Sequence, residues 1–272
     1  MTPRNAMPAK RARRRRVPAA LLAPAVVGLA FLILPLLGLL ARAPWAELPA
    51  RLAEPEMLAA LQLSLFTATA ATVLSLLFGI PIAWLLARGE FPGRSILRAL
   101  VTVPLVLPPV VGGVALLLVF GRNGIIGSWL YERFDITIPF TTTAVVLAMT
   151  FVSMPFLIVS VEGALRGADI RFEEAAATLG AGRWTVFTHV TLPMVAPGVL
   201  AGAVLCWARA LGEFGATITF AGNFSGRTQT MPLAVYLALQ TDLEAAIVLS
   251  LILLAVSVIV LASLRDRWTA AP

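Results

Sequence analysis

Six long apolar runs constrain this chain more than any other feature. They occupy residues 18–41, 58–87, 97–120, 142–163, 195–220 and 244–264. A helix needs about 20 mostly apolar residues to cross a bilayer, and each run is long enough. Of the 272 residues, 59% are hydrophobic and 13% are charged, whereas an ordinary soluble domain has about 25% charged residues. The sequence therefore predicts an all-α membrane protein with six transmembrane helices.

The basic residues gather at both ends of the chain and on the second and fourth connections between the runs. These segments hold fifteen of the 21 Lys and Arg residues, the other connections hold five, and Arg209 lies inside the fifth run. Basic loops remain in the cytoplasm, so both termini are expected to be cytoplasmic. Because the arginines sit between apolar runs, the net charge of +7 does not indicate nucleic-acid binding.

The amino end allows two interpretations. A basic start, an apolar run and the small residues of Ala41-Arg42-Ala43 together resemble a signal peptide, but the run is about twice as long as the usual 7–15-residue apolar region. We expect it to remain as the first span. Residues 1–16 are expected to form a disordered basic cytoplasmic tail because their like charges repel. Residues 17–265 are then a single transmembrane domain, and 266–272 a second cytoplasmic tail.

Few residues are available for catalysis or for metal binding. His189 and Cys206 are the single histidine and cysteine, which leaves no disulfide within the chain and little for a metal site or a catalytic triad. The phosphate-binding pattern G-x-x-x-x-G-K-[ST] is absent. We therefore expect a protein that is not an enzyme and binds no cofactor or metal. His189 is expected to be a surface residue rather than a pH sensor.

The fourth connection, about 164–194, has the pattern of ordered structure. Asp169 is placed to cap a helix by accepting from free backbone N–H groups. Four residues then share one helical face. They are Phe172, Ala175, Ala176 and Leu179. Gly180 is expected to end this helix, and a second short helix over 182–189 is expected to be closed by Pro193.

A motif with fixed spacing runs through the same connection. It consists of Glu174-Ala175-Ala176, three residues, Gly180, nine residues, and Val190-Thr191-Leu192-Pro193. This pattern resembles the EAA loop of bacterial ABC-importer permeases, with Val190 in place of isoleucine. The resemblance implies a type I ABC-importer fold and a coupling loop that sits in a groove of a separate ATPase subunit. Two such subunits would use ATP and rock the spans between two states.

The residues assigned to coupling follow from that motif and from the aromatic residues around it. They are Phe172, Glu174, Ala175, Ala176, Leu179, Gly180, Trp184, Leu192 and Pro193. Helix-in-groove docking needs apolar anchors. The candidate anchors are Phe172, Leu179, Trp184 and Phe187. Packing of these side chains against the spans of the chain itself is the alternative.

Four further stretches bear on the transported substrate. Residues 104–111 and 121–124 look like molybdate permeases, 208–216 like molybdate and sulfate permeases together, and 222–236 more like the molybdate branch. The resemblance implies import of molybdate, and of tungstate, across the bacterial inner membrane, with sulfate or thiosulfate as the alternative. It also implies a second copy of the chain and an external oxyanion-binding protein. A channel or secondary transporter without a partner is a more distant alternative, since no internal repeat is evident.

Two charged residues in the fifth run are the candidates for an anion pathway. Arg209 and Glu213 are one helical turn apart, and charges inside a membrane usually face a bundle interior or an aqueous cavity. Arg209 either offsets the repulsion of a passing dianion or forms a purely structural ion pair. Thr217 and Thr219 either donate hydroxyl hydrogen bonds along the same run or bond to their own backbone.

The third run combines prolines and glycines in its first half. Pro104, Pro108 and Pro109 precede Gly112 and Gly113, which predicts either a broken segment that hinges or lines a cavity, or a simple turn at the membrane interface. In the fourth run, Glu162 is expected to pair with Arg166 one turn away, or to extend toward the interface.

Overall fold

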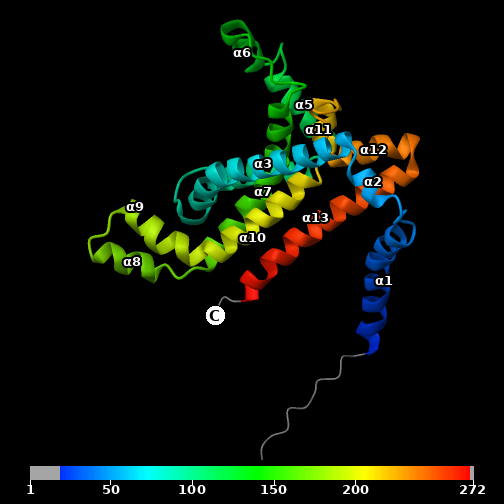
Figure 1. Ribbon diagram of the computed structural model, residues 1–272. Coiled ribbons are helices and arrows are strands. Elements are labelled where there is room, and N and C mark those ends of the chain that lie inside the picture. The colour runs from blue at the N-terminus through cyan, green and yellow to red at the C-terminus, as the bar shows by residue number, and fades with distance from the viewer. Residues whose placement is uncertain (1–18, 270–272) are drawn as a thin grey trace, which may run out of the picture. The chain divides into compact units, whose positions relative to one another are not determined.

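The computed structural model describes residues 19–269, with side chains for 21–260 and 262. All regular structure in this part of the chain is helical (Figure 1). The helices are α1 Ala19–Ala41, α2 Leu48–Leu52, α3 Pro55–Arg88, α4 Arg94–Val106, α5 Pro109–Phe120, α6 Gly127–Phe134, α7 Thr142–Gly167, α8 Arg171–Thr178, α9 Arg183–Val186, the π-helix η1 Phe187–Thr191, α10 Leu192–Leu211, α11 Gly215–Ala221, α12 Met231–Thr241 and α13 Leu243–Thr269. The predicted tail 1–16 lies outside the described residues, as do 270–272.

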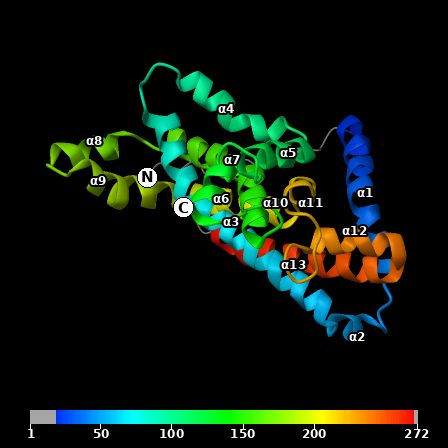
Figure 2. The same ribbon diagram turned by 90° about the horizontal axis from the view of Figure 1, so that it is seen from above.

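The chain divides into two units, 1–43 and 44–272. The described part of the first unit is essentially α1, a 23-residue apolar helix with two internal prolines. The second unit holds every other helix. Within it, α8 and α9 lie at one end and α12 at the other in both views (Figures 1 and 2).

Helix α7 forms the centre of the second unit and packs against α3, α10 and α11. Its side chains supply much of two buried clusters, one around Val145 and Met149 and the other around Leu157 and Val161. Small residues of α3, among them the fully buried Ala68 and Ala71, allow the helices to approach closely. At the start of α7, the Thr141 hydroxyl accepts from the N–H of Ala144 at 3.3 Å, which satisfies a free helix donor.

Buried hydroxyls inside the helices donate hydrogen bonds to backbone carbonyl oxygens one turn earlier. Thr72 donates to Ala68 O at 2.8 Å, and Ser153 donates to Met149 O at 2.6 Å. Ser64 has a different role, because its hydroxyl accepts from the Met231 N–H at 2.7 Å and so joins α3 to α12. Polar side chains can therefore lie in an apolar bundle without the cost of an unpaired donor.

Within residues 19–269, five helical segments are long and apolar enough to cross a membrane, and the bent pair α4–α5 makes a sixth if it counts as one span. The five are 21–41, 55–88, 142–167, 183–211 and 243–260. The predicted run 97–120 is therefore not one helix, because α4 and α5 meet at an angle of 117°. Pro108 and Pro109 explain the break, since a proline restricts the residue before it to extended conformations.

The prediction of one continuous helix over 195–220 was wrong. Helix α10 ends at Leu211, and a separate helix α11 begins at Gly215. The Glu213 carboxylate lies in the break and accepts from the Ala216 N–H at 2.8 Å, so it satisfies a free donor at the start of α11. The carboxylate replaces the backbone carbonyl that would accept from this N–H in a continuous helix, and hydrophobicity alone does not reveal such a replacement.

An ion pair stabilises the turn between α12 and α13. Asp242, between α12 and α13, accepts from the Ala245 N–H at 3.0 Å and pairs with Arg51 of α2 at 3.1 Å. The backbone hydrogen bond from Ala245, together with the Arg51 charge, holds the pKa of the Asp242 carboxyl below its usual value. The arrangement joins the short helix α2 to the start of α13.

Candidate functional site

Helix α8 carries the predicted coupling motif and has the expected ends. Before its first turn, the Asp169 carboxylate accepts from the Arg171 N–H at 3.0 Å. At its end, Gly180 has φ +88°, its N–H donates to Ala177 O at 3.0 Å, and the Ala181 N–H donates to Ala176 O at 3.1 Å. These two bonds form a Schellman motif, which needs a left-handed residue where glycine is favoured. Gly180 therefore ends the helix, as predicted.

Most of the apolar candidate anchors on and after α8 are exposed. Leu179 is 89% exposed, Trp184 75% and Phe172 61%. Phe187 is half-buried and lies beside Trp184, with ring centroids 5.8 Å apart. Phe172 and Leu179 are therefore not packed against the long helices, whereas Trp184 is largely exposed but lies beside Phe187 of η1. His189 is also exposed.

The second half of the loop differs from the prediction. Instead of a short helix closed by Pro193, α9, η1 and α10 form one continuous helical segment from Arg183 to Leu211. The π-turn explains how proline is tolerated, because the Leu192 N–H donates to Phe187 O, five residues back, just before Pro193. Pro193, the second residue of α10, supplies no N–H to the continuous segment, and the wider π-turn just before it accommodates this break in the hydrogen bonding. Leu192 and Pro193 thus begin a membrane-length helix.

An ion pair connects the end of α3 to α8. Arg88 Nη2 lies 3.0 Å from Glu173 Oε1, and the two side chains are only 14% and 16% exposed. Glu173 directly precedes the Glu174-Ala175-Ala176 motif and shares the inward side of α8 with Ala176, whereas Glu174 is exposed. The sequence offers no signal for this pair, since 85 residues separate its members. It fixes the candidate coupling helix to one of the long helices.

Glu162 of α7 binds two arginines with the same carboxylate oxygen. Arg166 Nη2 lies 2.8 Å from Oε1, which confirms the predicted pair, and Arg98 Nη2 of α4 lies 2.6 Å from the same atom. Glu162 itself is 8% exposed. The Arg98 contact was missed because the two residues are distant in sequence. It holds α4 against the basic end of α7.

Arg209 and Glu213 form the predicted pair, but they do not lie on one continuous helix as expected. Arg209 Nη2 lies 2.6 Å from Glu213 Oε2, and their side chains are 27% and 1% exposed. Arg209 lies in the last turn of α10 and Glu213 in the break, so one uninterrupted helix does not carry both. The carboxylate therefore pairs with Arg209 through one oxygen and caps α11 through the other.

The two threonines of the predicted pathway lie on α11 rather than on α10, and their environments differ. Thr219 donates its hydroxyl proton to Gly215 O at 2.8 Å. Thr217 is fully buried, and its hydroxyl has no hydrogen-bond partner among the described residues. A buried hydroxyl without a partner is costly. Thr217 is therefore the residue of the two with a donor to offer.

Helix α11 packs directly on α5, the second half of the bent pair. A Cβ atom on Gly113 would lie 2.7 Å from Thr219 Cβ and 2.8 Å from Ala216 O, so only glycine fits. The proline- and glycine-rich third run thus contacts the element that follows the Arg209–Glu213 pair. Among the described residues, no group of three or more His, Cys, Asp or Glu side chains is arranged to hold a metal.

Comparisons with known proteins agree with one another. A family model described as the inner membrane component of binding-protein-dependent transport systems matches residues 79–270. The molybdenum transport system permease protein ModB of Mycobacterium bovis is 50% identical over 246 residues, which are 90% of this chain and 92% of that protein. The protein of that name in Escherichia coli K12 is 45% identical over 219 residues, 80% and 95% of the two chains.

A second group of relatives carries a different substrate name. The sulfate transport system permease protein CysT of Escherichia coli K12 is 39% identical over 238 residues, 86% of each chain. The likeness covers a similar share of the chain at lower identity. Both predicted branches are thus represented among the relatives.

Solved structures share the fold at low sequence identity. A bacterial ABC transporter that imports the acidic polysaccharide alginate matches with a TM-score of 0.69 at 17% identity, covering 92% of this chain and 94% of that one. The MetNI methionine ABC transporter, in an inward-facing conformation, matches with a TM-score of 0.60 at 16% identity, covering 79% and 95%. These likenesses confirm the predicted all-α fold of importer permeases.

Proposed function

The chain belongs to the family of inner membrane components of binding-protein-dependent transport systems, and from that premise we propose that it carries molybdate across the bacterial cytoplasmic membrane as the permease subunit of an ATP-driven importer. The assignment of molybdate as the substrate rests on one observation, the 50% identity over 90% of the chain to a permease named for molybdenum transport. Tungstate, a tetrahedral dianion of similar size, is expected to be carried too.

The partners in this proposal are two ATPase subunits, a second copy of the chain and an external oxyanion-binding protein. The exposed Phe172, Leu179 and Trp184 support docking of α8 and the start of α9 in a groove of the ATPase, because helix-in-groove binding uses such apolar anchors. ATP is then used by that subunit. A symmetric pair is the common closed arrangement of identical chains. The loops 42–56, 121–140 and 221–243 would face the binding protein.

Movement of the coupling helix would reach the spans through two links, an ion pair and the chain itself. Glu173 pairs with Arg88 at the end of α3, and α8 continues through the Gly180 turn into the segment α9–η1–α10. Glu174, Ala175 and Ala176 form the motif itself, and Leu192 and Pro193 begin α10. A pull on α8 is therefore transmitted to two long helices at once.

The anion pathway is proposed to pass the junction of α10 and α11. The Arg209 guanidinium, which is 27% exposed, reduces the repulsion of a dianion, and Glu213 holds it in place while it caps α11. Thr217 offers a hydroxyl donor without a partner among the described residues. Thr219 takes a secondary part, because its proton is already bound to Gly215 O.

Uptake of labelled molybdate and labelled sulfate by cells with and without the gene tests the substrate. Loss of molybdate uptake with sulfate uptake retained supports the proposal. Loss of sulfate uptake alone would support the second candidate, a sulfate or thiosulfate permease, which the 39% identity to CysT favours. Uptake that follows the proton gradient and survives ATP depletion would contradict ATP-driven import altogether.

Arg209→Ala tests the pathway separately from the fold. We expect molybdate uptake to fall at least tenfold while the protein still inserts and co-purifies with its ATPase. Arg171→Ala, at an exposed arginine outside the α10–α11 junction, is the control and should retain uptake. If Arg209→Ala abolishes assembly instead, the pair with Glu213 is structural.

A further inference from the structure

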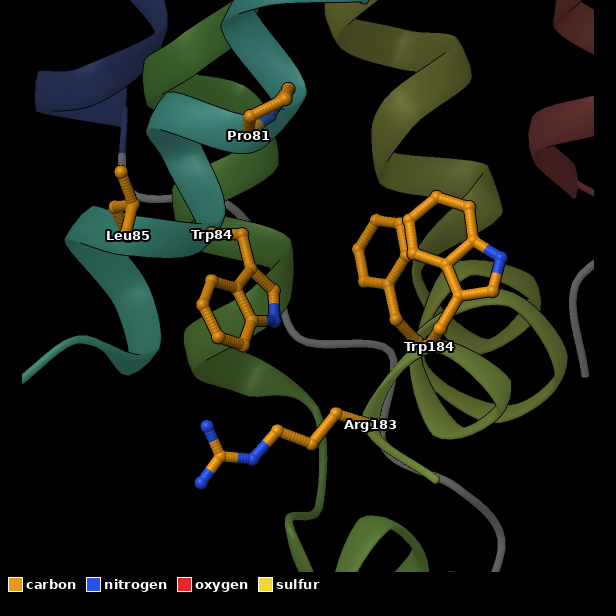
Figure 3. Close-up of a pocket in the computed structure, with 6 residues that line it drawn as sticks. Pro81, Trp84, Leu85, Arg183 and Trp184 are labelled. Atoms are coloured by element: carbon orange, nitrogen blue, oxygen red, sulfur yellow. The ribbon is translucent and has the colours of Figure 1, made fainter. Parts of the chain in front are cut away.

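A cavity of about 380 Å³ opens between the end of α3 and the start of the segment α9–η1. Its lining consists of Pro81, Trp84, Leu85, Arg183, Trp184 and Phe187. Figure 3 shows Arg183 reaching beneath Trp84, with Trp184 on the other side of the opening. The volume falls within the range of about 300–1,000 Å³ that is typical of small-molecule sites.

The lining combines one cation with an apolar wall. Trp84, Leu85 and Trp184 are 36%, 42% and 75% exposed, so the wall is open to its surroundings. The Arg183 side chain forms no hydrogen bond or ion pair within the described residues. The other described arginines around this end of the unit do have partners. They are Arg88, Arg94, Arg98, Arg166 and Arg171. The guanidinium of Arg183 is therefore available to an anion.

The position of the cavity indicates the kind of anion. Trp84 lies one turn before Arg88, at the basic end of the apolar helix α3, and tryptophan is enriched where membrane spans meet water. A small soluble anion would gain nothing from the apolar wall, and an uncharged lipid would gain nothing from the arginine. A phospholipid with a net negative headgroup uses both, because arginine binds phosphate and the aromatic wall packs against an acyl chain.

We infer that this cavity binds an anionic phospholipid, with its phosphate on Arg183 and an acyl chain against Trp84, Leu85 and Phe187. A neighbouring cavity of about 230 Å³ shares Trp84, Arg183 and Phe187 and is also lined by Glu173 of α8. The bound lipid thus lies next to the Arg88–Glu173 pair. It bridges α3 and α9 beside the coupling helix, which makes the local lipid composition a determinant of how firmly these elements are held together.

Native mass spectrometry of the full-length chain, purified in mild detergent with its co-expressed partner subunits, tests this site. Dioleoylphosphatidylglycerol is added to wild type and to Arg183→Gln, and dioleoylphosphatidylcholine serves as the uncharged comparison. We expect one tightly held phosphatidylglycerol per chain. Arg183→Gln should weaken it about fivefold, since an arginine near an anionic lipid contributes about that factor. Arg171→Gln, at an 87% exposed side chain of the same loop, is the matched control and should bind like wild type.

A second measurement locates the acyl chain and does not depend on a charge variant. Phosphatidylglycerol brominated on its acyl chains should quench tryptophan fluorescence saturably, and Trp84→Phe combined with Trp184→Phe should remove that saturable part. Equal binding of the two lipids, unchanged binding by Arg183→Gln, or full displacement by millimolar inorganic phosphate would overturn the inference. If Arg183→Gln and Trp184→Ala leave lipid binding intact but lose the co-purifying ATPase, the cavity is a protein-docking surface and the lipid site is wrong.

Discussion

At the residue scale, Glu162 shows how one carboxylate fixes two elements. Its Oε1 lies 2.6 Å from an Arg98 nitrogen and 2.8 Å from an Arg166 nitrogen. Removing one partner of a buried ion pair costs about 3–5 kcal/mol, but the two arginine side chains are 38% and 47% exposed and stay hydrated. We therefore expect Glu162→Gln to lower the free energy of unfolding by about 1–2 kcal/mol, measured as a lower Tm in detergent. Arg166→Gln, which leaves the Arg98 pair, should cost less, and an unchanged Tm for Glu162→Gln would contradict this.

Gly180 is needed for its backbone conformation and for its N–H. At φ +88° an alanine costs about 1–2 kcal/mol, and a proline also removes the donor to Ala177 O. Gly180→Ala should reduce molybdate uptake, and Gly180→Pro should abolish it while the protein still inserts. Gly182→Ala is the matched control, because Gly182 has φ −65° and open space around it, so its uptake should match wild type. Wild-type uptake by Gly180→Pro would contradict a role of the loop in coupling.

Thr217 allows substrate contact to be separated from stability. Its buried hydroxyl has no partner among the described residues, so Thr217→Val keeps the shape of the side chain and removes no hydrogen bond. We expect an unchanged or slightly higher Tm together with a several-fold fall in molybdate uptake. Thr72→Val, at a buried hydroxyl that is bonded to Ala68 O, should leave uptake unchanged. Unimpaired uptake by Thr217→Val would remove this residue from the pathway.

Local chemistry explains which residues could be placed from the sequence. Asp169 and Gly180 were predicted correctly because a cap and a left-handed turn depend on neighbours within a few residues. The Glu162–Arg166 pair is local in the same way. Arg98 and Arg88, by contrast, find their carboxylates 64 and 85 residues away, and only the packing of the helices brings these groups together.

At the element scale, the Arg88–Glu173 pair joins a long helix to the helix that is proposed to dock on the ATPase. With both side chains mostly buried, we expect the pair to contribute about 1–2 kcal/mol and to transmit movement of α8 to α3. Arg88→Glu or Glu173→Arg alone should cut molybdate uptake several-fold while ATP hydrolysis persists. The double exchange, which restores opposite charges, should recover much of the loss.

The control for this pair lies in the same loop. Arg171 is 3.8 Å from Asp169, and its side chain is 87% exposed, so Arg171→Glu should change uptake little. If the double exchange transports no better than the single variants, the two charges do not act through each other.

Element boundaries were harder to predict than element existence. Apolar length located α1, α3, α7 and α13 correctly, but it could not reveal that Glu213 caps α11 or that a π-turn carries the chain through Pro193. In both places a backbone N–H donates outside the regular i→i−4 pattern, once to the Glu213 carboxylate and once to Phe187 O, and this decides the outcome. Hydrophobicity contains no information about such bonds. The fifth run was therefore predicted as one helix, and the second helix of the coupling loop was predicted to end before Pro193.

At the scale of the whole molecule, helix α7 separates two exposed loops. Ile125 precedes it in the chain and is 83% exposed, and Leu179 follows it and is 89% exposed. With 26 residues, α7 is about 39 Å long at 1.5 Å per residue, enough to cross a hydrocarbon core of about 30 Å. The two positions should therefore face opposite sides of the membrane, whatever the total number of spans.

Cysteine labelling tests both this separation and the proposed orientation. The single native cysteine, Cys206, is fully buried, so wild type should give little background with a membrane-impermeant maleimide. The basic loops around α8 are proposed to be cytoplasmic. In intact spheroplasts we therefore expect Ile125→Cys to be labelled and Leu179→Cys to be protected until the membrane is permeabilised. Labelling of Leu179→Cys alone would invert the orientation and move the ATPase-docking surface to the wrong side. Labelling of both from outside would mean that α7 does not cross the membrane.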